Sequence, residues 1–172
     1  SFCYDQLIQY YGGVPYIDHA LSLDDMYYPR MDKMEIVRRI LEDLDDSLLD
    51  ALPQRWPAAE GTARFSRAAA YMLKARIYLN YATEENGYMQ KAVEYSDKAI
   101  EIAERNGHKL SEYDLTYYSD HTSGEPNCRL FSYSGEQDDE WLWSLQYNSL
   151  STDLVTINVY YCAPRTLNGA SW

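Results

Sequence analysis

The acidic side chains that could take part in catalysis gather in one short stretch, where Glu136, Asp138, Asp139 and Glu140 follow one another closely. Glycoside hydrolysis needs two carboxylates on opposite sides of the scissile bond, and adjacent acids in a polar loop do not provide that arrangement. The stretch also lacks the glycine and the alternating ligands of a calcium-binding EF-hand loop. We therefore expect a solvated or calcium-tolerant loop here rather than a catalytic site.

Histidine and cysteine residues are too scattered to indicate a metal site or a nucleophile. The three histidines are His19, His108 and His121, and no two of them have the spacing of a zinc-binding HExxH helix. The three cysteines, Cys3, Cys128 and Cys162, show no CxxC spacing. We expect no metal, no cofactor and no catalytic thiol, while a bridge between Cys128 and Cys162 stays open for an oxidising compartment.

The composition indicates one folded domain and excludes several classes of partner. The 172 residues are 46% hydrophobic and 24% charged, which is close to the usage of globular domains. The formal net charge of −12 repels phosphate backbones and anionic lipid headgroups. Nucleic acid is therefore an unfavourable partner, and no apolar run approaches the length of a membrane span.

Tyrosine is unusually frequent, with 18 residues against only 3 phenylalanines. One explanation is packing at partly hydrated helix junctions, where the ring is buried and the hydroxyl still finds a hydrogen-bond partner. The other is a binding surface that stacks on flat or sugar-like ligands. The composition favours the first explanation and leaves the second open.

Two helices are predicted in the first 53 residues. The first covers residues 2–10 and ends at Gly12-Gly13, and a largely exposed connection follows over residues 14–30. The second begins after Asp32, with Glu35 at the spacing of a capping box, and continues to Leu52-Pro53. Its predicted buried stripe is Met34, Val37, Ile40 or Leu41, Leu44 and Leu48.

Two further helices are rich in alanine and tyrosine. Ser66 is placed to cap a helix from Arg67 to Tyr81, and the next helix runs from Tyr88 to Arg105 and ends at Asn106-Gly107. The small residues expected at close helix contacts are Ala68, Ala69, Ala70 and Ala75 in the first, and Ala92, Ala99 and Ala103 in the second. We also expect Tyr95 or Ser96, Val93, Ile100 and Ile102 to add buried area. This pattern predicts a tetratricopeptide-like helix pair, without a clean 34-residue repeat.

The rest of the chain is rich in Tyr, Asp, Ser, Asn and Gly, and only residues 141–145 alternate like a short strand. We predict a mainly α domain over residues 1–172, divided into a helical-repeat part at 1–110 and an irregular, loop-rich part at 111–172. Long irregular segments on a rigid base often carry function, so we expect the ligand in this half. The residues at both ends suggest a fragment of a longer protein.

Several of these segments resemble, in order, motifs of the SusD/RagB family of outer-membrane nutrient-binding lipoproteins. The most specific is the stretch from Arg64 to Tyr71 with its continuation from Leu73 to Leu79, which is similar to the family's Arg-x-Thr/Ser-Lys/Arg start and Ala-x-x-x-x-Lys-Ala-Arg helix. The others are Tyr10 to Pro15, Glu35 to Leu44 followed by Leu52-Pro53, Ala92 to Ile100 with Tyr113 and Leu115, and Glu140 to Trp143. Each motif also has a structural explanation as a helix stop, a cap or a close-packed small residue.

The resemblance implies a non-catalytic protein that binds a nutrient, with a glycan favoured, and delivers it to a TonB-dependent SusC-type transporter. It implies a lipoprotein at the outer-membrane surface, touching the membrane only through a lipid anchor that this stretch lacks, since Cys3 follows Phe2 inside a predicted helix. Binding residues of the family lie in variable loops, so none can be transferred by position. A helical-repeat adaptor for a protein segment is the alternative, and a carbohydrate-active hydrolase is a weaker one.

Candidate ligand-binding residues are therefore chosen from the irregular C-terminal stretch, where aromatic and polar side chains are dense. They are Tyr160, Tyr161, Arg165, Asn168 and Trp172. A sugar can place its CH face on a Tyr or Trp ring while its hydroxyls remain available for hydrogen bonds. Simple packing is the competing explanation for these five residues.

Overall fold

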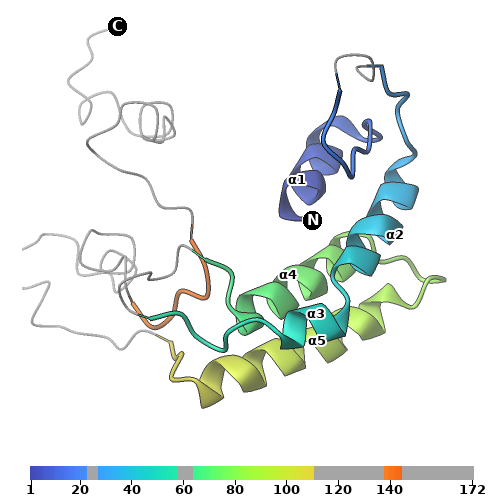
Figure 1. The fold of residues 1–172 in the computed structure, drawn as a ribbon. Coiled ribbons are helices and arrows are strands. Elements are labelled where there is room, and N and C mark those ends of the chain that lie inside the picture. The colour runs from blue at the N-terminus through green and yellow to red at the C-terminus, as the bar shows by residue number, and fades with distance from the viewer. Residues whose placement is uncertain (23–26, 58–63, 111–137, 145–172) are drawn as a thin grey trace, which may run out of the picture.

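A computed structural model describes residues 1–22, 27–57, 64–110 and 138–144. These residues form helices and no strand (Figure 1). The helices are α1 (Phe2–Tyr11), α2 (Lys33–Asp43), α3 (Asp46–Asp50), α4 (Arg67–Asn80) and α5 (Tyr88–Arg105). The predicted mainly α class is confirmed.

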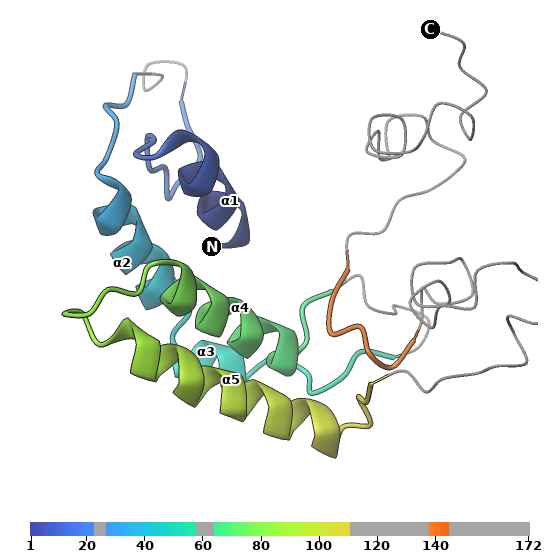
Figure 2. The same ribbon diagram turned by 180° about the vertical axis from the view of Figure 1, so that it is seen from behind.

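Helices α4 and α5 lie side by side and antiparallel, and they make the most extensive helix contact of the described chain (Figures 1 and 2). The alanines expected at close contacts, Ala68, Ala69, Ala70 and Ala75 of α4 and Ala92, Ala99 and Ala103 of α5, are all buried. Ser66 caps α4, since its hydroxyl accepts a hydrogen bond from the Ala69 amide at 3.3 Å. The sequence prediction of a close-packed helix pair is thus confirmed.

The turn after α5 also matches the prediction. Gly107 has a φ of 83°, in the left-handed region that glycine adopts without strain. The amide of His108 then donates to the carbonyl of Ala103 at 3.0 Å. This turn directs the chain toward the segment 138–144, which contacts it.

The predicted single helix from residue 33 to residue 52 is wrong, because the chain breaks between α2 and α3. Asp45 has extended backbone angles, and its carboxylate accepts a hydrogen bond from the Ser47 amide at 2.9 Å, which starts a new helix. The break changes which residues face the core. Leu49 is buried, whereas Leu48, predicted to be buried, is 60% exposed.

Other predicted core positions are also exposed. Met34, Val93 and Ile100 are 43%, 57% and 47% exposed, respectively. In α5 the buried side chains form one stripe, Ala92, Tyr95, Ala99 and Ala103. The bulkier Val93 and Ile100 lie beside this stripe and are exposed to solvent. Leu79 at the end of α4 is exposed in the same way.

The start of α2 uses half of the predicted capping box. The carboxylate of Asp32 accepts from the amides of Met34 at 2.8 Å and Glu35 at 3.3 Å. The Glu35 side chain does not reach back but pairs with Arg38, accepting from Nη2 at 2.6 Å. One acid therefore fixes the helix start while the other joins the solvated charged face.

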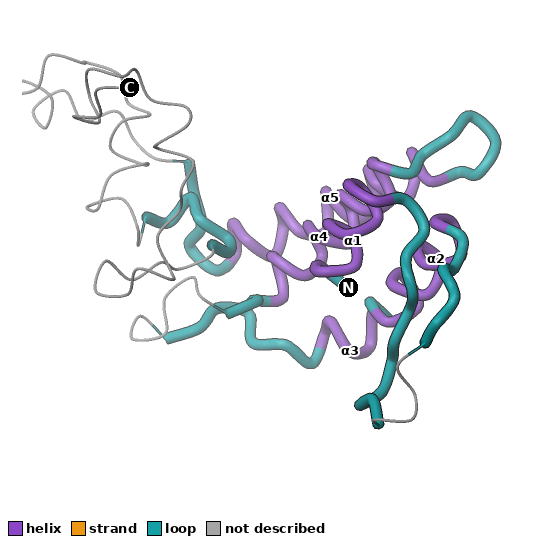
Figure 3. Tube along the Cα trace, turned by 90° about the horizontal axis from the view of Figure 1, so that it is seen from above, coloured by secondary structure: helices purple, strands orange, loops and turns teal. Residues whose placement is uncertain are grey.

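Helix α1 packs against α2, and the described parts of the connection between them are the teal segments that run beside α2 in Figure 3. Arg30 holds this loop near α1, because its Nη2 and Nε donate to the carbonyls of Tyr11 and Gly13, both at 2.6 Å. The Met31 amide donates to the Val14 carbonyl at 3.0 Å. The described part of the connection is extended and mostly exposed, as predicted.

The predicted strand at residues 141–145 is not found, since residues 141–144 adopt no strand and residue 145 lies outside the described chain. A strand would direct neighbouring side chains to opposite faces. Instead Leu142 and Trp143, which are adjacent in sequence, line the same hollow on α4.

No helix of the described residues is both long and apolar enough to cross a membrane.

Candidate ligand-binding site

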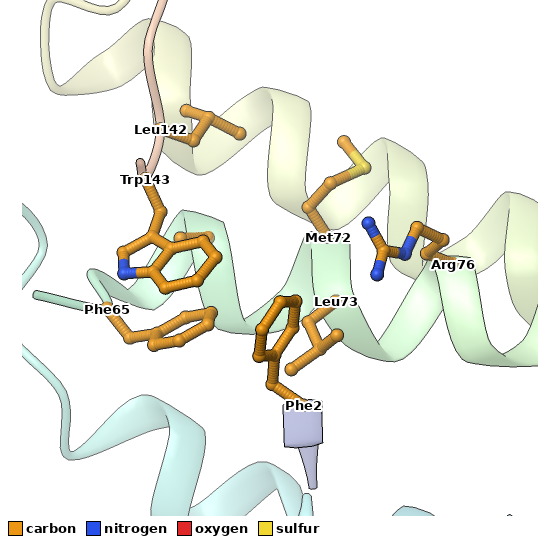
Figure 4. Close-up of a pocket in the computed structure, with 8 residues that line it drawn as sticks. Phe2, Phe65, Met72, Leu73, Arg76, Leu142 and Trp143 are labelled. Atoms are coloured by element: carbon orange, nitrogen blue, oxygen red, sulfur yellow. The ribbon is translucent and has the colours of Figure 1, made fainter. Parts of the chain in front are cut away.

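A hollow of about 150 Å³ lies where the first turn of α1, one face of α4 and the segment 138–144 meet (Figure 4). Its lining is mostly aromatic and aliphatic. The residues are Phe2, Phe65, Ala69, Met72, Leu73, Arg76, Leu142 and Trp143. Small-molecule sites in proteins are commonly apolar hollows with a few polar groups, so this hollow is the candidate site.

Helix α4 supplies the floor of the hollow, because its lining residues recur at three- and four-residue spacing and share one face. Phe65 stands immediately before the cap residue Ser66. Its carbonyl accepts a hydrogen bond from Nε1 of Trp56 at 2.8 Å, which fixes the backbone at the entrance to the helix. The position of the Phe65 ring therefore follows from the start of α4.

Three aromatic rings meet in the hollow (Figure 4). Trp143 stacks on Phe65, with ring centroids 4.3 Å apart and planes inclined by 20°. Phe2 meets Trp143 edge to face at 4.9 Å. These contacts join three segments that are far apart in the sequence, and such ring pairs each contribute about 0.5–1.5 kcal/mol beyond buried area.

Polar contacts hold the segment that carries Trp143 against the helices. The carboxylate of Asp139 pairs with Arg55, and the backbone carbonyl of Asp139 accepts a hydrogen bond from Nδ1 of His108 at 2.9 Å. The carboxylate of Asp138 accepts from the Glu140 amide at 3.0 Å. Asp138 and Asp139 of the acidic stretch therefore make structural contacts, whereas the sequence predicted a solvated loop here. Glu136 lies outside the described chain.

Arg76 is the charged member of the lining, and a buried acid lies behind it. Nη2 of Arg76 is 3.3 Å from Oδ2 of Asp5, whose side chain is fully buried, while that of Arg76 is 47% exposed. Asp5 also accepts from Gln9 at 2.9 Å and from the Tyr81 hydroxyl at 3.3 Å. Burial and the neighbouring Asp5 raise the pKa of Tyr81, which keeps it a hydrogen-bond donor.

The lining can bind a ring but offers little for acid–base chemistry. Its side chains are aromatic, aliphatic or guanidinium, and a guanidinium does not give up its proton near neutral pH. Among the described residues, no group of three or more His, Cys, Asp or Glu side chains could hold a metal ion. The hollow suits a ligand with an apolar face and a polar edge.

A second aromatic cluster explains part of the tyrosine content by packing. Tyr71 and Tyr78 both stack on Tyr95, with ring centroids 6.0 and 5.5 Å apart. Lys74 lies 4.3 Å from the Tyr95 ring centre, and its Nζ pairs with Asp46 at 2.6 Å. For these tyrosines the packing explanation is confirmed, because Tyr71 and Tyr95 are buried.

The ligand-binding residues chosen from the sequence all lie outside the described residues and remain predictions. They are Tyr160, Tyr161, Arg165, Asn168 and Trp172. Cys128, Cys162 and His121 also lie outside, whereas Cys3 is an exposed free thiol. The sequence analysis did not identify the hollow. Its one compositional signal is that two of the three phenylalanines, Phe2 and Phe65, line it.

Comparison with protein families gives a match over residues 1–79 to a SusD-like family described as "Starch-binding associating with outer membrane". The match includes α1, α2, α3 and nearly all of α4, which together carry most of the hollow. A comparison with curated protein sequences finds no significant match.

Solved structures give the same fold. A SusD-like protein from Bacteroides fragilis is 25% identical, with a TM-score of 0.61 over 89% of this chain and 26% of its own. A surface glycan-binding protein A from Bacteroides uniformis is 21% identical, with a TM-score of 0.58 over 83% of this chain and 28% of its own. The chain thus spans about a quarter of the length of these structures.

Proposed function

We propose that this chain, whose residues 1–79 match a SusD-like family model, belongs to that family and binds a nutrient, most specifically a glycan, at the surface of the outer membrane. The observation that carries the proposal is the match of residues 1–79 to a family that is described as starch-binding and associated with the outer membrane. The similar fold of a surface glycan-binding protein supports the choice of a glycan. The protein that contains this chain would act by binding, without transforming the glycan.

The hollow on α4 supplies a physical means of binding. A sugar ring has an apolar CH face that can lie against an aromatic side chain, here Phe2 or Trp143. Its hydroxyls can accept hydrogen bonds from the N–H groups of Arg76 at the rim of the hollow. Weak apolar contact and a few directed hydrogen bonds suit reversible capture rather than chemistry.

The family match also suggests how the bound glycan is used. We infer that the protein is a surface lipoprotein that delivers its ligand to a TonB-dependent SusC-type transporter, and that it needs no cofactor. The irregular part at residues 111–172 would contribute further contacts to the ligand in this proposal.

A glycan array followed by calorimetry of the full-length protein tests the proposal. We expect binding to at least one class of starch-type, plant or host polysaccharide, with no reducing ends released on prolonged incubation. Indifference to every carbohydrate would reject the proposal, and released reducing ends would favour a hydrolase.

A protein–protein adaptor is the second candidate, and one observation favours it. Met89, Val93 and Ile100 of α5 are about half exposed and recur at helical spacing, as on a helix face that contacts another chain. Replacement of Val93 by Glu separates the two functions. It would abolish binding of a protein partner and leave glycan binding intact.

A further inference from the structure

The pairing of Arg76 with Asp5 determines how much charge the hollow presents to a ligand. Arg76 lines the hollow and is partly exposed, whereas Asp5 lies behind it with no exposed surface. Within the described chain only Nη2 of Arg76 hydrogen-bonds to protein, through its contact with Asp5 at 3.3 Å. The other N–H groups of the guanidinium make no hydrogen bond to the described residues and can donate to a ligand.

An isolated guanidinium at this position would favour a carboxylate, because its planar array of donors matches two carboxylate oxygens. Here the positive charge faces Asp5, whose buried carboxylate is screened by salt much less than an exposed acid would be. A carboxylate that bound Arg76 would also be repelled by Asp5, and by a chain whose net charge is −12. A neutral hydroxyl accepts the same hydrogen bonds without that repulsion.

The size of the hollow fits one ring. A protein cavity of roughly 150 Å³ is known to hold a benzene molecule, so a hollow of about 150 Å³ accommodates the face of a single six-membered ring. The three aromatic side chains provide the apolar contact, and Cζ of Arg76 lies over the Phe2 ring, 5.9 Å from its centre.

We propose that Asp5 is a positioning residue that makes this hollow select uncharged sugar rings over acidic ones. Asp5 acts through Arg76, since it holds the guanidinium in place and cancels its charge, and it does not contact the ligand itself. The inference rests on the proposed function, because it applies to a site that binds sugars.

The test uses the full-length protein and two matched ligands, methyl α-glucoside and methyl α-glucuronoside, which differ by one carboxylate. Ligand-observed NMR titration should show tighter binding of the neutral glycoside to the wild type. Asp5→Asn keeps the shape of the side chain and removes its charge. We expect this variant to raise the affinity ratio of acidic to neutral glycoside by about tenfold, the effect of one nearby charge.

Two further variants separate selectivity from folding. Glu101→Gln, at an exposed ion pair with Arg105 on α5, changes the net charge equally and should leave the ratio unchanged. Arg76→Gln leaves Asp5 without its cation, so it should weaken binding of both glycosides and lower the acidic-to-neutral ratio. This variant carries the test if Asp5→Asn does not fold.

The outcomes distinguish this inference from the proposed function. A protein that binds no carbohydrate on the array contradicts the proposed function itself. A protein that binds glycans but neither methyl glycoside, or whose selectivity is unchanged in both Asp5→Asn and Arg76→Gln, overturns only the role of Asp5.

Discussion

Gly13 is required by the close approach of two chain segments. A Cβ atom at this position would clash with the carbonyl oxygen of Met31, which is backbone and cannot move aside. We expect Gly13→Ala to destabilise the protein by about 2–3 kcal/mol, which chemical denaturation can measure. Gly87→Ala is the control, since Gly87 has a φ of 67° but open space around it, and it should cost about 1 kcal/mol. Equal costs would show that the Gly13–Met31 approach is not required.

Asp46 of α3 pairs with Lys74 of α4 and Lys98 of α5, and it makes the stability of this helix junction depend on pH. Burial disfavours its charged form, but hydrogen bonds and charge from Lys74 and Lys98 outweigh burial, and the pKa of Asp46 is lowered from its usual value of 3.8. Its contribution to stability is therefore present above pH 3.8 and is lost as the pH falls through the lowered pKa.

We expect Asp46→Asn to lower the free energy of unfolding by about 1 kcal/mol at pH 7, since the Asp46 side chain is partly exposed and its ion pairs are partly screened. The difference from wild type should shrink when both proteins are unfolded by denaturant below pH 3. A difference that stays the same at both pH values would show that the charge of Asp46 does not stabilise the junction.

At the scale of elements, the small residues of α5 set the distance between α4 and α5. Ala99 is fully buried in this contact, while its neighbour Ile100 is 47% exposed. Ala99→Leu should destabilise the protein by about 1–3 kcal/mol through overpacking, as judged from the thermal midpoint and denaturant unfolding. Ile100→Ala should cost less than about 1 kcal/mol. If Ala99→Leu were tolerated as well as Ile100→Ala, the close helix pair would be ruled out.

The same elements show what the sequence could predict. Caps and alanine positions were predictable, because Ser66, Asp32 and Ala99 act through local geometry or side-chain size. The sequence does not predict the break at Asp45, because the apolar spacing continues through it and hides a second cap. The predicted buried stripe therefore contains Leu48 in place of Leu49.

The hollow was not predictable from the sequence for a different reason. Phe2, Phe65, Arg76 and Trp143 come from separate segments, and no spacing relates them. Their assembly depends on how α1 and the segment 138–144 dock on α4, which is a tertiary property. The five residues predicted in the C-terminal stretch lie outside the described chain and remain predictions.

At the scale of the whole molecule, α1, α4 and the segment 138–144 meet around an aromatic hollow. Trp143 belongs to a short segment that Arg55 and His108 tie to the helices, and its ring completes the wall beside Phe65. The proposed function and the role of Asp5 both place the sugar against this wall. Loss of the Trp143 ring should therefore affect binding more than it affects folding.

Calorimetric titration of the full-length wild type and Trp143→Ala, with the glycan that binds best on an array, tests the central claim most directly. We expect the variant to lose at least about tenfold in affinity, as for the loss of one stacking ring, and Val93→Ala on the exposed face of α5 to bind like the wild type. An unchanged affinity of a folded Trp143→Ala protein would contradict the claim that this hollow binds the glycan.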